Sequence, residues 1–272
     1  MTLQQLTPLY RPISLEEMSA VKLMNRIDTK FVMSVDTLCR LLEMARPDYR
    51  MQDTEAGGRN AAYHTVYMDT TGYEMYRAHV VGHAGRQKIR VRSYVDSDLH
   101  FLEVKTKNNH GRTKKKRVSV GWQIPAEGTR ADALLPLDRQ QLADTLQGDT
   151  LDFVSAKLHY DARTLQPVIE NRFHRITLVN SAMTERLTID TSLQFDNLRT
   201  GRHLELPSMA IVELKRDGRQ PSPVLGMLQQ LRVHPQGFSK YAMGLALTDA
   251  ALHAGRLKPR LIKVWKNFLP NS

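Results

Sequence analysis

The sequence predicts an α+β fold built around an antiparallel β-sheet. Several segments alternate charged and aliphatic residues, which is the period-two pattern of a strand whose two faces meet different surroundings. The connections among the three segments between Lys88 and Val120 are too short for the crossovers that parallel strands require. Helical spacing appears between and after these segments, and 41% hydrophobic residues in a chain of 272 can cover a sizeable core.

The first predicted element is a short helix. Ser14 and Glu17 stand at the spacing of a capping box, which predicts a helix that runs from there through Val21. The stretch RIDTKFVM (26–33) then alternates like a strand. The sequence thus predicts a short helix followed by the first strand of the sheet.

A second helix and a run of strands complete the first half. Asp36 or Thr37 can cap a helix that ends at Arg46, before Pro47. The pattern then predicts a helical stretch near 71–79 and four strands: YHTVYMD (63–69), KIRVRSYV (88–95), HFLEVKTK (100–107) and TKKKRVSV (113–120). The short turns between the last three strands predict an antiparallel meander.

The second half repeats the alternation of strands and helices. A polar, helical segment covers about 131–160, and strands are expected at 167–180, 185–197 and 208–217. Helices are expected near 223–231 and 239–252. No linker rich in Pro or Gly separates the halves, so we expect one domain over residues 1–272.

The faces of the strands leave two architectures open. In KIRVRSY, Arg90 and Arg92 lie on one face and Ile89 and Val91 on the other, and about half a dozen strands share this division. An open sheet would pack the apolar face on helices and solvate the charges. A closed barrel would enclose them, and cations about 6 Å apart repel by roughly 3 kcal/mol at an effective dielectric near 20. A bound polyanion would relieve that repulsion.

Net charge indicates an anionic partner. The chain carries +11 at pH 7, and residues 86–117 hold eleven Lys or Arg against three acids, a net of +8. Nucleic acid, a membrane surface and a phosphate-rich small molecule all fit this charge. Only 7% of residues are aromatic, and the basic strands lack the aromatic pair of an RNA-recognition sheet, so we do not expect nucleic acid as the partner.

Several other classes are excluded by composition. A single cysteine, Cys39, rules out an internal disulfide framework and a zinc site with several cysteines. The ten histidines show no spacing typical of metal ligands. No window approaches the roughly 20 apolar residues of a membrane helix, and the opening residues do not resemble an export signal. We therefore expect a soluble, cytoplasmic protein.

The basic strands have the chemistry of a phosphate site. Arg offers a fork of donors that matches phosphate oxygens, and Lys supplies a point charge. The residues that alternate in the required way are Arg90, Arg92, Lys105, Lys107, Lys114 and Lys116. Glu213, two residues before Lys215, can be a structural ion-pair partner or a ligand of a divalent cation that bridges phosphate oxygens.

Eight motifs occur in the order found in one family. They are RIDTKFVMS, KIRVRSY, FLEVKTK, GRTKKKRV, FHRITLVN, ERLTID, IVELK and FSKYAMGL, from about Met24 to Leu247. In this the chain resembles the VTC domain, the polyphosphate polymerase domain of the triphosphate tunnel metalloenzyme superfamily. The resemblance implies a closed antiparallel β-barrel, a tunnel with a charged lumen and helices packed outside, with its core at about 24–248. It implies transfer of the γ-phosphoryl group of ATP to a growing polyphosphate chain, with Mn or Mg ions.

The same resemblance implies roles for individual residues. The catalytic cations would be Lys30, Arg90, Arg92, Lys105 and Arg175. Further phosphate contacts would come from Lys116, Arg186, Lys215, Ser239 and Lys240, and Glu213 would be the metal ligand. Two alternatives on the same fold stay open: a hydrolase of triphosphate or polyphosphate, and a non-catalytic polyphosphate or nucleotide sensor.

The C-terminal segment 253–272 is basic and partly apolar. GRLKPRLIKVWKNF holds five Lys or Arg together with Trp265, Phe268 and four aliphatic side chains. We expect it to pack as a helix or tail across one end of the fold. Docking on an anionic membrane or a membrane protein is the alternative.

Overall fold

The computed structural model describes residues 1–19, 26–54, 57–109, 113–121, 144–218 and 220–269. By contacts the chain forms two compact units. The first comprises residues 1–61, 173–193 and 206–238, and the second comprises residues 62–172, 194–205 and 239–272. Two long strands contribute residues to both units, which explains why no linker in the sequence marks a boundary.

The strands form one largely antiparallel sheet in the part of the chain that the structure describes. They are β1 (Arg11–Ile13), β2 (Arg26–Ser34), β3 (Tyr49–Gln52), β4 (Ala61–Thr70), β5 (Gln87–Tyr94), β6 (Leu99–Lys107), β7 (Thr113–Ser119), β8 (Leu165–Asn180), β9 (Glu185–Asn197), β10 (His203–Leu206) and β11 (Met209–Asp217). Their order is β2-β11-β9-β8-β4-β5-β6-β7, with β10 beside β9 and β3 beside β8. The pair β1–β3 is parallel.

The helices of the described residues have 4 to 11 residues each. They are α1 (Leu3–Leu6), α2 (Leu15–Ser19), α3 (Val35–Ala45), α4 (Glu74–Val81), α6 (Gly148–Ser155), α7 (Pro223–Gln230), α8 (Lys240–Thr248) and α9 (Lys258–Phe268). Single 3₁₀ turns cover Thr7–Leu9, Val95–Ser97, Ala162–Thr164 and Gly255–Leu257. Among the described residues, no helix is long and apolar enough to cross a membrane.

The helix starts follow local capping chemistry. Ser14 and Glu17 form the predicted capping box, in which each backbone N–H donates to the other side chain at 2.8 and 3.1 Å. The second helix begins two or three residues earlier than predicted. Ser34, rather than Asp36 or Thr37, caps it, because the Ser34 hydroxyl accepts the backbone N–H of Thr37 at 3.1 Å.

The prediction of a closed barrel is wrong. In the described residues the strand order begins at β2 and ends at β7, and no pairing joins these two edges. The alternation of charged and apolar residues that suggested a lumen is a property of each strand, whereas closure depends on pairing between strands far apart in sequence. The edge strand β7 carries Lys and Arg along its length, a common protection of an open edge.

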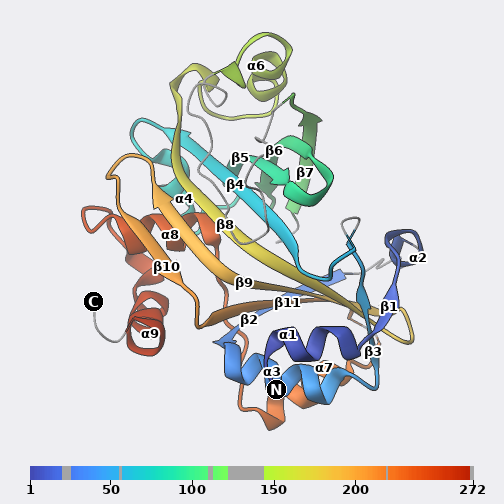
Figure 1. The fold of residues 1–272 in the computed structure, drawn as a ribbon. Helices are drawn as coiled ribbons and strands as arrows, with labels where there is room; N and C mark the ends of the chain where they lie inside the picture. The colour runs from blue at the N-terminus through green and yellow to red at the C-terminus, as the bar shows by residue number, and fades with distance from the viewer. Residues whose placement is uncertain (20–25, 55–56, 110–112, 122–143, 219, 270–272) are drawn as a thin grey trace. The chain divides into compact units, whose positions relative to one another are not determined.

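The first unit has its own hydrophobic core. Phe31 of β2, Val212 of β11 and Ile189 of β9 face one another in register and are almost fully buried. They pack with Leu38 and Leu42 of α3 in one cluster. Figure 1 shows α1, α3 and α7 gathered beside β2 and β11, which accounts for the burial of this sheet face.

The second unit buries both faces at the middle of β5. Val66, Val91 and Leu102 lie opposite one another on β4, β5 and β6 and have no exposed surface. The other face is also buried, since Arg90 and Arg92 are only 6% and 8% exposed. The charged face of β5 therefore does not meet bulk water, as a plain solvated sheet would.

Candidate functional site

The pairing register gathers charged side chains on one face of β5, β6 and β7. Residues directly opposite one another in antiparallel strands share a face. The register forms one row of Lys88, Lys105 and Lys115 and a second row of Arg90, Glu103 and Arg117, with Arg92 in the next row. We call these seven residues the basic face of the second unit.

Arg90 and Glu103 form the centre of this face. The Arg90 guanidinium donates from Nε and Nη2 to Oε2 of Glu103, at 2.7 and 2.5 Å. Its Nη1 donates to the hydroxyl of Tyr67 at 3.3 Å. Glu103 has no exposed surface. The side chain of Arg90 is therefore held in one orientation by a buried ion pair and a tyrosine.

The carboxylate of Glu103 is the counter-ion of several basic side chains. Besides Arg90, Glu103 accepts Lys115 at 3.2 Å, and the ammonium of Lys105 lies 3.9 Å away. Burial alone would raise the pKa of Glu103, but the charges of Arg90, Lys105 and Arg92 outweigh it and lower the pKa to about 2. The carboxylate is thus charged at neutral pH, and the cations still outnumber it.

This surplus acts on Lys105. Burial, and then repulsion from Arg90 and Arg92, lower the pKa of its ammonium group to about 5, against the attraction of Glu103. The low pKa means that additional positive charge is unfavourable at the position of Lys105. An anion beside the ammonium group would raise its pKa again.

Lys116 lies on the opposite face of β7. It pairs with Val104, whereas Lys115 pairs with Lys105 and Arg117 with Glu103. The structure therefore brings Arg90, Arg92 and Lys105 together as expected but adds Lys115 and Arg117 in place of Lys116. The run KKKR has cations on both faces of the strand, so only the register of the β6–β7 pair could distinguish them.

Ser239 and Lys240 begin helix α8 beside the same face. Ser239 caps the helix, and its hydroxyl accepts the ammonium of Lys88 at 2.8 Å. The start of the helix is fixed by Tyr241, whose hydroxyl donates to Asp69 at 2.5 Å. Burial and the neighbouring carboxylate of Asp69 raise the pKa of Tyr241 far above its ordinary value. Sequence reasoning placed Lys88 on the charged face but did not include it in the site.

The first unit has a basic face of its own. Glu213 of β11 stands between Lys30 of β2 and Thr188 of β9, and Lys215 stands opposite Arg186. On the same face, Asp190 accepts the guanidinium of Arg175 at 2.6 and 2.9 Å. The predicted residues that meet here are Lys30, Arg175, Arg186, Glu213 and Lys215.

Glu213 is the counter-ion of two lysines. Its Oε1 accepts the ammonium of Lys30, and its Oε2 accepts that of Lys215 at 2.5 Å. Burial would raise the pKa of Glu213, but the charges of Lys215 and Lys30 and their hydrogen bonds lower it far below its ordinary range. The carboxylate stays ionised over the whole physiological range.

The donors for a metal ion are few. Among the described residues, no group of three or more His, Cys, Asp or Glu side chains gathers as a metal site. Mg²⁺ and related ions in phosphate sites commonly take one or two protein carboxylates and fill the remaining positions with phosphate oxygens and water. Glu213 fits that pattern as a single protein ligand, provided that Lys30 and Lys215 turn from it to the phosphates.

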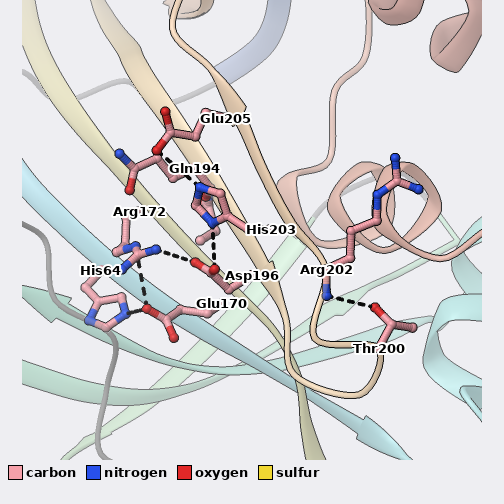
Figure 2. A network of polar contacts seen from close by, with 10 residues as sticks. His64, Glu170, Arg172, Gln194, Asp196, Thr200, Arg202, His203 and Glu205 are labelled. Atoms are coloured by element: carbon pink, nitrogen blue, oxygen red, sulfur yellow. Dashed lines mark hydrogen bonds and ion pairs between the residues drawn. The ribbon is translucent and has the colours of Figure 1, made fainter. Parts of the chain in front are cut away.

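A separate polar network occupies β4, β8, β9 and β10 of the second unit. Figure 2 shows His64 beside Glu170 at 2.5 Å, Arg172 bridging Glu170 and Asp196, and His203 beside Asp196 at 2.7 Å. The hydrogen bond to Asp196 raises the pKa of His203. These charges are matched within the network, which is typical of a structural role.

A serine, a histidine and an aspartate also line up on the face opposite Arg92. His100 lies 2.8 Å from the hydroxyl of Ser93 and 2.9 Å from Asp98. This resembles the order of a catalytic triad. However, Ser93 has no exposed surface, so its oxygen cannot reach a substrate, and this arrangement does not support nucleophilic catalysis.

An antiparallel sheet with two such basic faces defines an α+β protein suited to hold anionic groups. The family model of the VTC domain matches residues 25–248, so the chain belongs to the VTC domain family. This confirms the family indicated by the ordered motifs.

Comparison with other proteins gave distant similarities. A proposed adenylate cyclase from Bacillus halodurans is 12% identical, with a TM-score of 0.47 over 79% of this chain and 96% of that one. A proposed adenylyl cyclase from Hippeastrum, described as having a dominant triphosphatase activity, is 13% identical, with a TM-score of 0.48 over 84% and 100% of the two chains. No curated protein matches the chain.

Proposed function

We propose that this chain is a metal-dependent polyphosphate polymerase that transfers the γ-phosphoryl group of ATP to a growing polyphosphate chain. The observation that carries the proposal is the crowding of Arg90, Arg92, Lys105 and Lys115 around the single buried carboxylate of Glu103. Arg90 and Arg92 are almost fully buried, whereas the side chains of Lys105 and Lys115 are 31% and 43% exposed. So many basic groups beside one carboxylate favour a polyanionic ligand. Membership in the VTC domain family favours a phosphate chain as that polyanion.

Catalysis in this proposal is electrostatic. The guanidinium and ammonium groups hold the phosphate oxygens while the terminal phosphate of the chain attacks the γ-phosphorus of ATP in line. The bond from the γ-phosphorus to the bridging oxygen breaks, and ADP leaves. Fixed cations stabilise the charge that develops on the transferring group, so no protein nucleophile is required.

The metal ion has one candidate protein ligand. When bound, a divalent ion acts as a Lewis acid toward the phosphate oxygens and neutralises part of their charge. We assign Glu213 as the protein ligand and Lys30 and Lys215 as the groups that exchange their carboxylate partner for phosphate. The ion-pair geometry of the free protein supports this exchange, because both lysines already flank the carboxylate.

The test is turnover of ATP by the purified chain with Mn²⁺ or Mg²⁺, with products sized on a gel. Phosphate polymers together with ADP are the expected result. Release of orthophosphate from tripolyphosphate without polymers would replace the polymerase by a hydrolase of the same fold. Tight binding of polyphosphate without turnover under any divalent ion would leave a sensor.

We also propose that helix α9 binds an anionic membrane surface. Its buried side chains Leu261 and Val264 face the protein, whereas Ile262 and Trp265 are 39% and 42% exposed among lysines. Exposed Trp and Lys on one helix favour an anionic lipid surface. Co-sedimentation with phosphatidylserine vesicles, lost in Trp265→Ala, tests this. ATP as the phosphoryl donor favours a cytoplasmic location.

A further inference from the structure

Three aromatic rings meet at one end of the basic face of the second unit. The rings of Tyr63 and Tyr94 have centroids 5.1 Å apart with 60° between their planes. Tyr94 and Phe101 follow edge to face, with centroids 6.0 Å apart and planes at 83°. They come from the consecutive strands β4, β5 and β6, and the pairing register of these strands brings them together. The low aromatic content of the chain gave no sign of this grouping.

The rings share their face with the cations. Tyr94 stands opposite Tyr63 and Leu99, in the row next to that of Arg92 and Phe101. Successive rows on one face are about 7 Å apart along a strand. The guanidinium of Arg92 lies over the Tyr63 ring at 5.5 Å from its centroid, and that of Arg117 lies over Phe101 at 4.2 Å. The aromatic and basic surfaces are therefore continuous.

The apolar end of the face differs from its basic centre in exposure. Tyr63, Tyr94 and Phe101 are partly exposed, and Leu99 beside them is 48% exposed. The neighbouring Arg90 and Glu103 are buried. We call Tyr63, Tyr94, Leu99 and Phe101 the aromatic patch. It offers partly uncovered ring surface at the side of a charged centre.

We propose that the aromatic patch binds the base of a nucleoside triphosphate whose phosphates lie on the basic face. The proposal rests on the proposed function, and it assigns a direction to the nucleotide: the base on the patch, and the phosphates toward Arg92 and then Arg90. Aromatic side chains stack on every base because each base has a π-face, and arginine guanidinium groups add cation–π contacts. A phosphate chain without a base has nothing to place on these rings.

A measurable preference follows. The protein should bind a nucleoside triphosphate more tightly than inorganic tripolyphosphate, although both offer three linked phosphates and tripolyphosphate can carry the higher negative charge. Purines should bind more tightly than pyrimidines, because the larger ring system covers more of the patch. The preference comes from the patch alone, so it should disappear when the rings are removed.

The experiment is calorimetry of the whole chain with a non-hydrolysable β,γ-imido ATP analogue and, in parallel, with tripolyphosphate, both in the presence of a chelator. Tyr94→Leu should weaken binding of the analogue roughly tenfold and change binding of tripolyphosphate by less than about twofold. Tyr63→Leu supplies a second variant if Tyr94→Leu does not fold. Tyr73→Leu is the matched control. The guanidinium carbon of Arg199 lies 4.8 Å from the centroid of the Tyr73 ring, and Tyr73 is not part of the aromatic patch.

Three results would overturn the proposal. Equal binding of both ligands by the unmodified chain would show that the base makes no contact. Equal weakening of both ligands in Tyr94→Leu would assign the ring to the phosphate site or to stability. A change of oligomeric state in Tyr94→Leu, with the affinity ratio intact, would make the patch an interface between copies. Failure of the proposed function would look different, since the unmodified chain would then make no phosphate polymer from ATP, whatever its affinities for the two ligands.

Discussion

Arg90 and Glu103 face each other across β5 and β6, and two nitrogens of the guanidinium donate to one oxygen of the carboxylate. The second carboxylate oxygen accepts Lys115. The carboxylate therefore acts as an internal anion for the basic face while no ligand is bound. In the first unit, Glu213 stands in the same relationship to Lys30 and Lys215.

Replacing Glu103 by Gln should separate stability from binding. Loss of the charge leaves Arg90 buried without its partner, which costs about 3–5 kcal/mol in the free energy of unfolding. The remaining cations should then bind tripolyphosphate more strongly, so the ligand should raise the melting temperature more than in the unmodified chain. Thermal unfolding with and without tripolyphosphate measures both effects.

The matched control is Glu43→Gln, which removes an equal charge from an exposed ion pair with the N-terminal amine. It should leave both melting temperatures almost unchanged. If Glu103→Gln were as stable as the unmodified chain and gained nothing from tripolyphosphate, the carboxylate would not be the counter-ion of the site.

Binding of a phosphate chain should take up a proton at Lys105. The free side chain has a pKa of about 5 and is mostly neutral at pH 7, and an anion beside it raises that pKa. The affinity for the phosphate chain should therefore fall as the pH rises above about 5, because protonation of Lys105 becomes less favourable. Calorimetry at pH 7 in buffers of different ionisation enthalpy counts the protons, and Lys105→Gln should lower the count. An unchanged count would contradict the prediction.

Two adjacent lysines of β7 should behave differently. Lys115 shares the face of Lys105 and Glu103, and Lys116 lies on the other face. Lys115→Gln should weaken tripolyphosphate binding roughly tenfold, the size of one charge-assisted contact, and Lys116→Gln should change it by less than about twofold. Both variants remove one charge from the same strand. Equal losses in a direct binding assay would mean that only overall charge matters.

Removing the charge of Glu213 should separate metal chemistry from phosphate binding. Glu213→Gln should lose about 10²–10³ in rate together with its response to Mn²⁺, because a fixed electrostatic element is gone. Tripolyphosphate binding with a chelator present should persist or become tighter, since Lys30 and Lys215 lose their carboxylate partner. Retention of rate and metal response with a lower melting temperature would identify Glu213 as a structural ion-pair partner.

His203 should make stability depend on pH. Its hydrogen bond to Asp196 raises the pKa of the folded imidazole above its ordinary value of 6.5. The stabilisation is fully present below about pH 6.5 and is lost as the pH rises through the folded pKa. The urea midpoint of the unmodified chain should exceed that of His203→Gln by more at pH 5.5 than at pH 9. A difference independent of pH would exclude the ion pair.

The two faces of single strands could be predicted from the sequence, whereas the pairing between strands could not. It assigned Arg90 and Arg92 to one face and Ile89 and Val91 to the other, because the period of two is local. It selected Lys116, whereas the register places Lys115 on the face of Lys105 and Glu103, since that choice depends on the pairing across the β6–β7 turn.

The open ends of the sheet and the aromatic patch were not predicted, because both depend on the pairing between strands. No pattern within a single strand records which residues of its neighbours lie opposite it. The internal counter-ion role of Glu103 also needed the structure, because a carboxylate on a charged strand face looks the same in sequence whether it is solvated or buried.

The pairing of β2 with β11 sets a condition on how the protein is made. β2 covers Arg26–Ser34, and its partner strand β11 lies at Met209–Asp217. During synthesis β2 cannot pair with β11 until β11 has left the ribosome. The long loop between the two strands also slows folding. Chains that end before β11 would expose an unpaired strand edge and its buried residues. Shortened fragments should therefore aggregate rather than fold as smaller active pieces.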